Sequence, residues 1–305
     1  MKMVGRLFLG IVAGNVAGVL LSLAAAWLVS HTTGMEGVII LPNLMIVPFV
    51  MGLVSAWIWG PLNMERGNCI LNTFISSIFS LGTAAVFLRE GAICLIIVFP
   101  VLFLFELAGS LAGRTFFRSN RNNLHLGLVP LAAMLTVGEP FLRTPERNVV
   151  TDEILIHAPP AKVWPQVTSF PEISAAPNFW LFRLGLPKPM ATAVEGDFVG
   201  ANRQCIFSGG AVFKETVAEI RPRELLTFDI VESPKDPELV GHLTAERGQF
   251  ELRDNHDGTT TLIGRTWYQL HVRPLWYFDW WTQHIFKAVH LRVMENVREK
   301  AEATK

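Results

Sequence analysis

The chain lacks an excess of charge of either sign, because its 305 residues include 26 Lys or Arg and 26 Asp or Glu. A nucleic-acid-binding protein is therefore not indicated, since such proteins carry a basic excess. Three cysteines are too few for a disulfide framework, and their spacing is not that of a metal site. The sequence also lacks a phosphate loop, a dinucleotide fingerprint, a nucleophile elbow and a zinc-protease motif. It indicates no cofactor and no metal.

Charged residues are scarce and unevenly distributed. They make up 17% of the chain, whereas about a quarter is typical of soluble globular proteins, and hydrophobic residues make up 50%. Residues 1–142 hold seven Lys or Arg and five Asp or Glu, but the remainder holds nineteen and twenty-one. This contrast predicts a transmembrane helical region, residues 1–142, followed by a water-soluble domain, residues 148–305.

Four apolar stretches of the first region reach the roughly 20 residues that a helix needs to cross a bilayer core. They are Leu7–Val29, Val38–Trp59, Cys69–Leu88 and Ala92–Ala112. A fifth stretch, Leu124–Leu142, is weaker because it contains two prolines, a histidine and a glutamate. We expect an all-α bundle of four to five helices and an integral, multi-pass protein of the cell (inner) membrane.

The side on which the soluble domain lies depends on the fifth stretch. Lys and Arg favour cytoplasmic loops, and Arg114, Arg118 and Arg121 follow the fourth span, so the N-terminus is expected inside. If the fifth stretch crosses, the domain is extracytoplasmic; if it lies in the interface, the domain is cytoplasmic. We favour five spans, because nineteen residues with one Glu can still cross.

Two features of the spans admit a functional and a structural interpretation. Gly10, Gly14 and Gly18 share one face of the first span, which permits close approach of a helix from a second copy in a homo-oligomer or from the same bundle. Glu106 lies in the fourth span, where a carboxylate is costly unless it is hydrogen-bonded or reaches the interface. In both cases we prefer the structural interpretation and expect the bundle to be an anchor.

The second region has the alternation and turn residues of a sheet between helices. A strand, Val149–Ile156, precedes a short helix, Pro159–Phe170, and a segment that is either helical or irregular, Pro171–Gly185. Five strand-like runs follow, with hairpin turns at Gly209-Gly210 and Asp257-Gly258. They are Phe198–Ser208, Ala211–Ile220, Leu225–Val231, Gly248–Leu252 and Thr259–Val272. The amphipathic stretch Leu275–Ala303 predicts a long helix that covers the apolar face of the sheet.

Several short stretches, in this order and spacing, resemble the START-like (SRPBCC) superfamily, nearest to its polyketide cyclase/dehydrase branch. They begin at Ile154, Gly200, Phe213, Gly248, Gly258 and His290. The resemblance covers about residues 149–303 and implies an α+β helix-grip fold, a curved antiparallel sheet wrapped on a long C-terminal helix. It also implies a cavity between sheet and helix for a hydrophobic or amphipathic, lipid-like ligand, but no single chemistry.

The strands beside Gly209-Gly210 predict a pair of charged side chains. Alternating apolar residues mark one face of each strand: Val199, Ala201, Cys205 and Phe207, then Phe213 and Val217. A three-residue loop or a glycine bulge brings these faces together, whereas a plain two-residue loop does not. In that register Arg203 lies opposite Glu215, with both side chains pointing inward. We interpret this pair as lining the cavity; a structural salt bridge or two solvated charges are the alternatives.

Further candidates lie on the last strand and the last helix. Thr266 and Tyr268 have hydroxyls among apolar neighbours, which either orient a ligand or bond to the backbone. His284 could act as a general acid or base, or could be structural, and His290 is expected to pack structurally. Trp281 belongs to an aromatic cluster that forms a pocket wall or meets lipid headgroups. The predicted ligand-binding residues are Arg203, Glu215, Phe207, Thr266, Tyr268, Trp281 and His284.

Three functions fit these patterns. The first is a membrane-anchored module that binds a hydrophobic small molecule or lipid, with the bilayer as its other partner. The second is an enzyme of the cyclase/dehydrase type, in which the Arg203 and Glu215 pair works with Tyr268 or His284. The third is a protein-interaction module that uses the aromatic cluster. We expect the first, without catalysis, and assign no catalytic residue.

Overall fold

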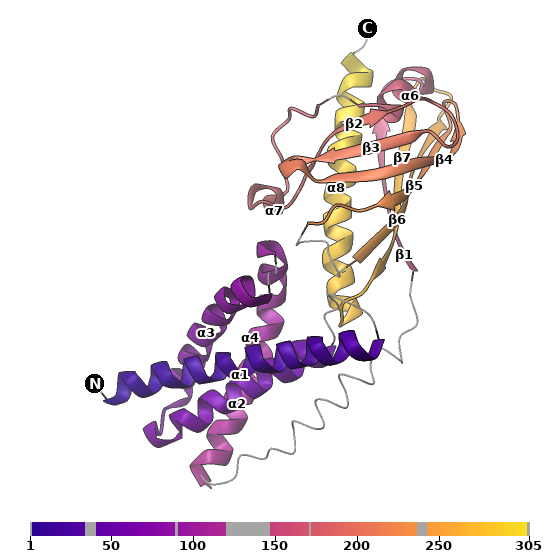
Figure 1. Cartoon of the computed structure of the whole chain (residues 1–305). Helices are drawn as coiled ribbons and strands as arrows, with labels where there is room; N and C mark the ends of the chain where they lie inside the picture. The colour runs from indigo at the N-terminus through magenta and orange to yellow at the C-terminus, as the bar shows by residue number, and fades with distance from the viewer. Residues whose placement is uncertain are drawn as a thin grey trace. The chain divides into compact units, whose positions relative to one another are not determined.

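The computed structural model describes residues 2–33, 41–88, 91–119, 147–170, 172–236 and 243–303. The chain forms two compact units, Met1–Thr144 and Pro145–Lys305 (Figure 1). The possible fifth span, Leu124–Leu142, falls outside the described residues. The number of crossings and the side of the second unit therefore stay predictions.

The first unit is built from helices that are nearly all apolar. Four of them are long and apolar enough to cross a membrane, at Met3–Ala25, Leu44–Leu62, Arg66–Val86 and Ala92–Phe117. They correspond to the four stretches expected from the sequence. The helices themselves are α1 (Lys2–Thr33), α2 (Leu41–Trp59), η1 (Gly60–Leu62), α3 (Arg66–Thr83), the π-helical turn η2 (Ala84–Leu88) and α4 (Ala92–Ser119).

Glycines allow α2 and α4 to pack backbone against backbone. A Cβ atom added at Gly52 would lie 2.0 Å from the Glu106 carbonyl oxygen, and one at Gly109 would lie 2.0 Å from the Phe49 carbonyl oxygen. Neither distance is possible for a real side chain. Small residues provide this close approach where no hydrophobic force drives helices together.

The glycine row of α1 packs within the same bundle. Cβ atoms added at Gly10, Gly14 and Gly18 would lie 2.1–2.4 Å from side-chain atoms of α2. Two α2 side chains also donate hydrogen bonds to the α1 backbone, Ser55 Oγ to Gly10 O at 3.0 Å and Trp59 Nε1 to Leu7 O at 3.1 Å. This is the structural alternative that we preferred, and a homo-oligomer through this face stays a prediction.

Glu106 is buried in the bundle and is hydrogen-bonded. The Ser77 hydroxyl of α3 donates to Glu106 Oε2 at 2.6 Å, and neither side chain is exposed. A polar group in hydrocarbon needs such a partner. The contact links α3 to α4, in agreement with a structural role.

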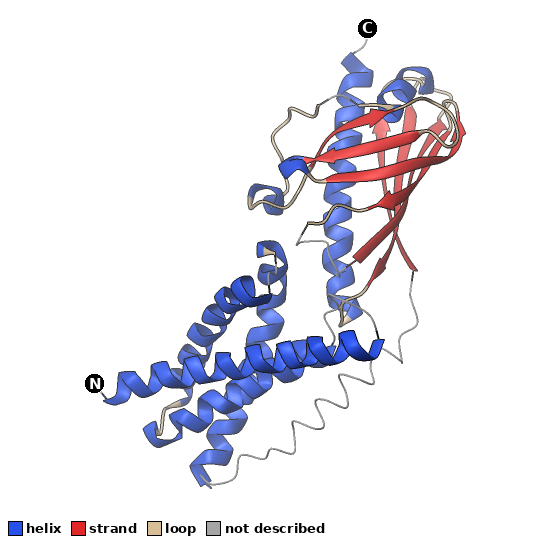
Figure 2. Cartoon of the chain, viewed as in Figure 1, coloured by secondary structure: helices blue, strands red, loops and turns tan. Residues whose placement is uncertain are grey.

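The second unit contains a curved, seven-stranded antiparallel sheet in the order β1-β7-β6-β5-β4-β3-β2 (Figure 2). The first and last strands of the chain are therefore neighbours, and β2 and β1 form the two edges. The strands are β1 (Arg147–Ile156), β2 (Pro189–Val194), β3 (Asn202–Phe207), β4 (Val212–Arg221), β5 (Leu225–Glu232), β6 (Leu243–Asp254) and β7 (Thr260–Leu270).

Three helices accompany the sheet: α6 (Pro160–Thr168) and α7 (Trp180–Arg183), between β1 and β2, and α8 (Leu275–Ala303) after β7. α8 packs along β1 and β7 (Figure 1). Its residues Val293, Met294 and Val297 join Ile156 and Leu262 in one core cluster, each at most 6% exposed. A curved sheet that wraps a long C-terminal helix is the helix-grip fold.

The predicted elements of this unit largely agree with the structure. The bounds of α8 are those expected, and both predicted hairpins form, between β3 and β4 and between β6 and β7. The prediction missed β2, a six-residue edge strand, and the first five residues of β6. It also started β3 too early: Phe198 and Gly200 lie in a turn, with Gly200 at φ +90°.

We expect Gly52→Ala to lower the free energy of unfolding of the first unit by about 1–3 kcal/mol, because overpacking forces α2 and α4 apart. The added methyl group would meet backbone, which cannot rotate away. Denaturant-induced unfolding of the full chain in detergent micelles measures this change. Gly82→Ala in α3 is the control, since no atom lies within 4 Å of the added Cβ. Equal losses in both variants would contradict the close packing.

Candidate ligand-binding cavity

A cavity lies on the inner face of the second unit's sheet, with α8 as its cover. Its volume is about 90 Å³. One water needs roughly 10–15 Å³ by this measure, so a small organic molecule fits. Most of the wall is apolar and aromatic, including Phe170, Phe207, Phe213, Phe250, Phe286 and Val293.

The predicted pair of charged residues lies in this wall. Arg203 of β3 and Glu215 of β4 are register partners, and Arg203 Nη1 donates a hydrogen bond to Glu215 Oε2. Their side chains are 2% and 5% exposed. The predicted register is confirmed: the hairpin has a three-residue turn, Ser208–Gly210, in which Gly209 and Gly210 have positive φ. Glycine adopts these angles without steric cost.

The pair is held in an apolar setting and is incompletely satisfied. Burial raises the pKa of Glu215, and the neighbouring guanidinium of Arg203 opposes that rise. The Arg203 guanidinium lies 4.4 Å from the centre of the Phe228 ring, a cation–π contact. Among the residues that the structure describes, Arg203 Nε has no hydrogen-bond partner. A buried donor without an acceptor is costly, so the arginine is incompletely compensated in this wall.

Cys205 also lines the cavity, between the two arms of the hairpin. Burial is the main reason that the pKa of its thiol rises to about 12, and the Glu215 carboxylate adds to the rise. The sulfur is therefore a thiol at neutral pH and is a poor nucleophile.

A chain of three polar side chains approaches the cavity from β1. Asp152 Oδ2 lies 2.9 Å from His290 Nδ1, and His290 Nε2 lies 2.8 Å from Thr266 Oγ1. Thr266 and His290 both line the cavity. Sequence reasoning expected His290 to be a packing residue and overlooked Asp152. The available signal was the position of Asp152 on the inward face of β1, between Val150 and Ile154.

Three other predicted site residues lie outside the described lining of this cavity. The Tyr268 hydroxyl donates to Asp279 Oδ1 at 2.6 Å, which ties β7 to the first turns of α8. Trp281 lies in α8 with its ring 6.4 Å from that of Trp180. His284 is exposed; its Nδ1 lies 2.6 Å from Trp280 O, and its ring is tilted at 41° to that of Trp280, with ring centres 4.1 Å apart. Ligand contact at these residues stays a prediction.

The aromatic cluster at the start of α8 is divided between solvent and interior. Trp276 is 75% and Trp280 53% exposed, whereas Phe278 is buried. By contrast Phe207, the remaining predicted site residue, lines the cavity beside Phe213, with ring centres 5.0 Å apart. The exposed tryptophans are accessible to lipid headgroups or to a protein partner, so both roles remain predictions.

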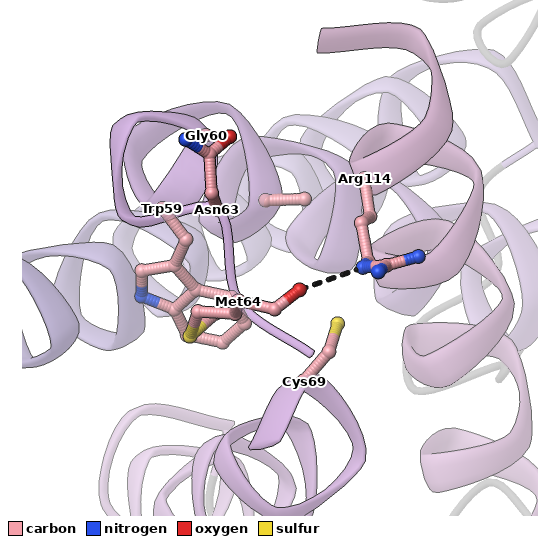
Figure 3. A pocket seen from close by; sticks show the side chains of 7 residues that line it. Trp59, Gly60, Asn63, Met64, Cys69 and Arg114 are labelled. Atoms are coloured by element: carbon pink, nitrogen blue, oxygen red, sulfur yellow. Dashed lines mark hydrogen bonds between the residues drawn. The ribbon is translucent and has the colours of Figure 1, made fainter. Parts of the chain in front are cut away.

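The first unit has a smaller pocket between the end of α2 and the adjoining parts of α3 and α4 (Figure 3). Arg114 of α4 donates from Nε to the Met64 carbonyl oxygen at 2.9 Å, and Cys69 and Asn63 complete the wall. The arginine thus holds the loop after α2. Among the described residues no cluster of three or more His, Cys, Asp or Glu side chains could hold a metal ion.

Comparison with protein-family models finds no match, and none of the curated proteins matches the sequence. Solved structures match over about half of the chain. Norcoclaurine synthase from Thalictrum flavum, in complex with dopamine and hydroxybenzaldehyde, is 14% identical over 53% of this chain and 90% of its own, with a TM-score of 0.37. A protein from Nitrosospira multiformis is 18% identical over 51% and 97%, with a TM-score of 0.36. These likenesses are weak, and the fold assignment depends on the strand order and on α8.

We expect Arg203→Met to lower the free energy of unfolding of the second unit by about 3–5 kcal/mol, because it leaves Glu215 as a buried, unpaired carboxylate. The double variant Arg203→Met/Glu215→Leu is expected to regain most of this loss. Urea titration of the full chain in detergent micelles measures both.

Lys214→Met is the matched control on the same hairpin. Lys214 and Glu232 form an ion pair whose side chains are 54% and 60% exposed, and such pairs contribute about 0–1 kcal/mol. A similar cost for Lys214→Met and Arg203→Met would show that the inner pair has no special energetic role.

Proposed function

We propose that the second unit binds a small, largely apolar molecule that carries a hydrogen-bond-accepting oxygen, and that the apolar helices of the first unit hold this binding domain at a membrane. The cavity carries the proposal. Its walls are mainly aromatic and aliphatic, and a few polar groups converge on it, as in known small-molecule sites.

The Arg203–Glu215 pair restricts the polar end of the ligand. A carboxylate or phosphate group would approach the Glu215 carboxylate as well as the arginine, so repulsion would cancel much of the attraction. A neutral carbonyl or hydroxyl oxygen approaches the Arg203 guanidinium without this cost. The chemistry of the wall therefore favours an uncharged amphipathic molecule over a fatty acid or a phospholipid headgroup.

The four apolar helices support a role at the bilayer. Apolar molecules concentrate in a membrane, and a binding domain tied to that membrane works at a higher effective concentration than a free one. The ligand is proposed to be lipid-like in solubility but small, because the cavity is partly filled by its own aromatic side chains.

An enzyme of the cyclase/dehydrase type is a second candidate. The observation that favours it is the Asp152–His290–Thr266 chain, since a histidine oriented by a carboxylate can transfer protons. Conversion of a polyketide-like substrate that is lost in His290→Gln, with binding kept, would support this candidate.

The binding proposal predicts that 1-octanol binds to the full chain in lipid nanodiscs and that Val289→Phe weakens binding at least tenfold. Val289 lines the cavity, so the larger side chain would occupy space that the probe needs. Calorimetric titration, corrected with empty nanodiscs, measures the affinity, and circular dichroism confirms folding.

Val231→Phe is the matched control, because Val231 is exposed on β5 and lies outside the cavity lining. Its affinity for 1-octanol is expected to equal that of the wild type. Absence of binding to the wild type, or the same affinity in all three proteins, would refute the binding proposal.

A further inference from the structure

The cavity has a second polar end, formed by the chain from Asp152 through His290 to Thr266. An ionised carboxylate only accepts hydrogen bonds, so His290 Nδ1 donates to Asp152. His290 Nε2 and Thr266 Oγ1 lie 2.8 Å apart. With a neutral imidazole, Nε2 is then an acceptor and the Thr266 hydroxyl donates to it, so that the lone pairs of Thr266 Oγ1 are left to accept a hydrogen bond at the cavity wall.

Packing alone does not explain this arrangement. The His290 and Asp152 side chains are 6% and 9% exposed, although the inward neighbours of Asp152 on β1 are Val150 and Ile154. A buried carboxylate costs several kcal/mol unless it is well paired, and an apolar residue would cost nothing here. Gly264 lies opposite Asp152, and a Cβ there would be 3.1 Å from Met294 Sδ but in ordinary contact, 3.7 Å, with His290 Cγ.

The two polar ends are separated by an apolar floor. Thr266 lies opposite Gly248, and Gly248 lies opposite Phe228 on the next strand. The Phe228 ring covers Gly248, because an added Cβ would meet two ring atoms at 2.4 Å, and Arg203 lies above that ring. Arg203 is on β3, four strands from Thr266 on β7, but its guanidinium reaches the Phe228 ring of β5. With a spacing of about 4.8 Å between neighbouring strands, the Thr266 and Phe228 backbones are about 10 Å apart.

We propose that Thr266 Oγ1 forms a second subsite, which accepts a hydrogen bond from a hydroxyl group at the far end of the ligand. This inference rests on the proposed binding function. It defines the ligand class as an elongated, apolar molecule with an acceptor oxygen at one end and a hydroxyl donor at the other. Thr266 contacts the ligand, whereas His290 and Asp152 are positioning residues.

Three probes of equal chain length test the subsite on the full chain in nanodiscs. The probe 1-octanol has one oxygen, 1,8-octanediol adds a donor and acceptor at the far end, and 8-methoxy-1-octanol adds an acceptor only. The wild type is expected to bind the diol about tenfold more tightly than 1-octanol, the gain of one good hydrogen bond. The methyl ether is expected to show no gain.

Thr266→Val removes the acceptor while keeping the shape of the side chain. We expect the diol to lose its tenfold advantage over 1-octanol in this variant. Thr216→Val, on β4 and outside the cavity lining, is the matched control and should keep the advantage.

Asp152→Asn tests whether Asp152 orients the His290 ring or only packs against it. An amide can donate to or accept from His290 Nδ1, so the imidazole tautomer is no longer fixed and the preference for the diol over the methyl ether should shrink at least threefold. If either variant proves unstable, its partner still tests the subsite, because one acts on the acceptor and the other on its orientation.

The outcomes separate this inference from the proposed function. Binding of 1-octanol without a gain for the diol, or with an equal gain for the methyl ether, would overturn the second subsite and leave the binding function standing. Failure of the wild type to bind 1-octanol would overturn both.

Discussion

The contact between α8 and the inner face of the sheet is the constraint on which the second unit depends. A curved antiparallel sheet exposes an apolar concave face, and such a face must be covered. α8 covers it by packing along β1 and β7, with Met294 and Val297 fully buried. Because β3, β4 and β5 curve away from this contact line, the space between them and the helix is filled by ring side chains and by the cavity.

Polar groups enter this apolar interior from two sides, and each is stabilised differently. Arg203 is compensated by Glu215 and by the Phe228 ring but keeps an unpaired Nε. Asp152 is compensated by His290, which in turn bonds to Thr266. Arg203 and Glu215 balance each other's charge. Asp152, His290 and Thr266 instead form a continuous chain of hydrogen bonds. The first is therefore the stronger attractant for a ligand oxygen, whereas the second sets orientation.

The sequence predicted the parts of the site that follow from strand alternation and turn chemistry. The register of Arg203 and Glu215 was predictable because glycines at positions 209 and 210 limit the turn and apolar residues mark the inner face. The pairing of Asp152 with His290 was not, since it joins residues 138 positions apart through the packing of α8. β2 was also not predictable, because its six residues are too few to show a clear alternation of apolar and polar side chains. It forms a strand through its pairing with β3.

The first unit, whose four long apolar helices are able to cross a membrane, packs through a different kind of contact. In lipid, apolar side chains would gain little by leaving their surroundings, and α2 and α4 meet through glycine contacts such as those at Gly52 and Gly109. A buried polar contact there, as between Ser77 and Glu106, adds to helix association.

In the second unit, buried polar side chains line a cavity instead of linking helices. An apolar wall discriminates weakly between ligands that differ by a methylene group, whereas an unpaired polar atom rejects a ligand that cannot satisfy it. In the proposed binding function, Arg203 and Thr266 would therefore set the selectivity of the cavity, and the aromatic side chains around them would set the size of what can enter.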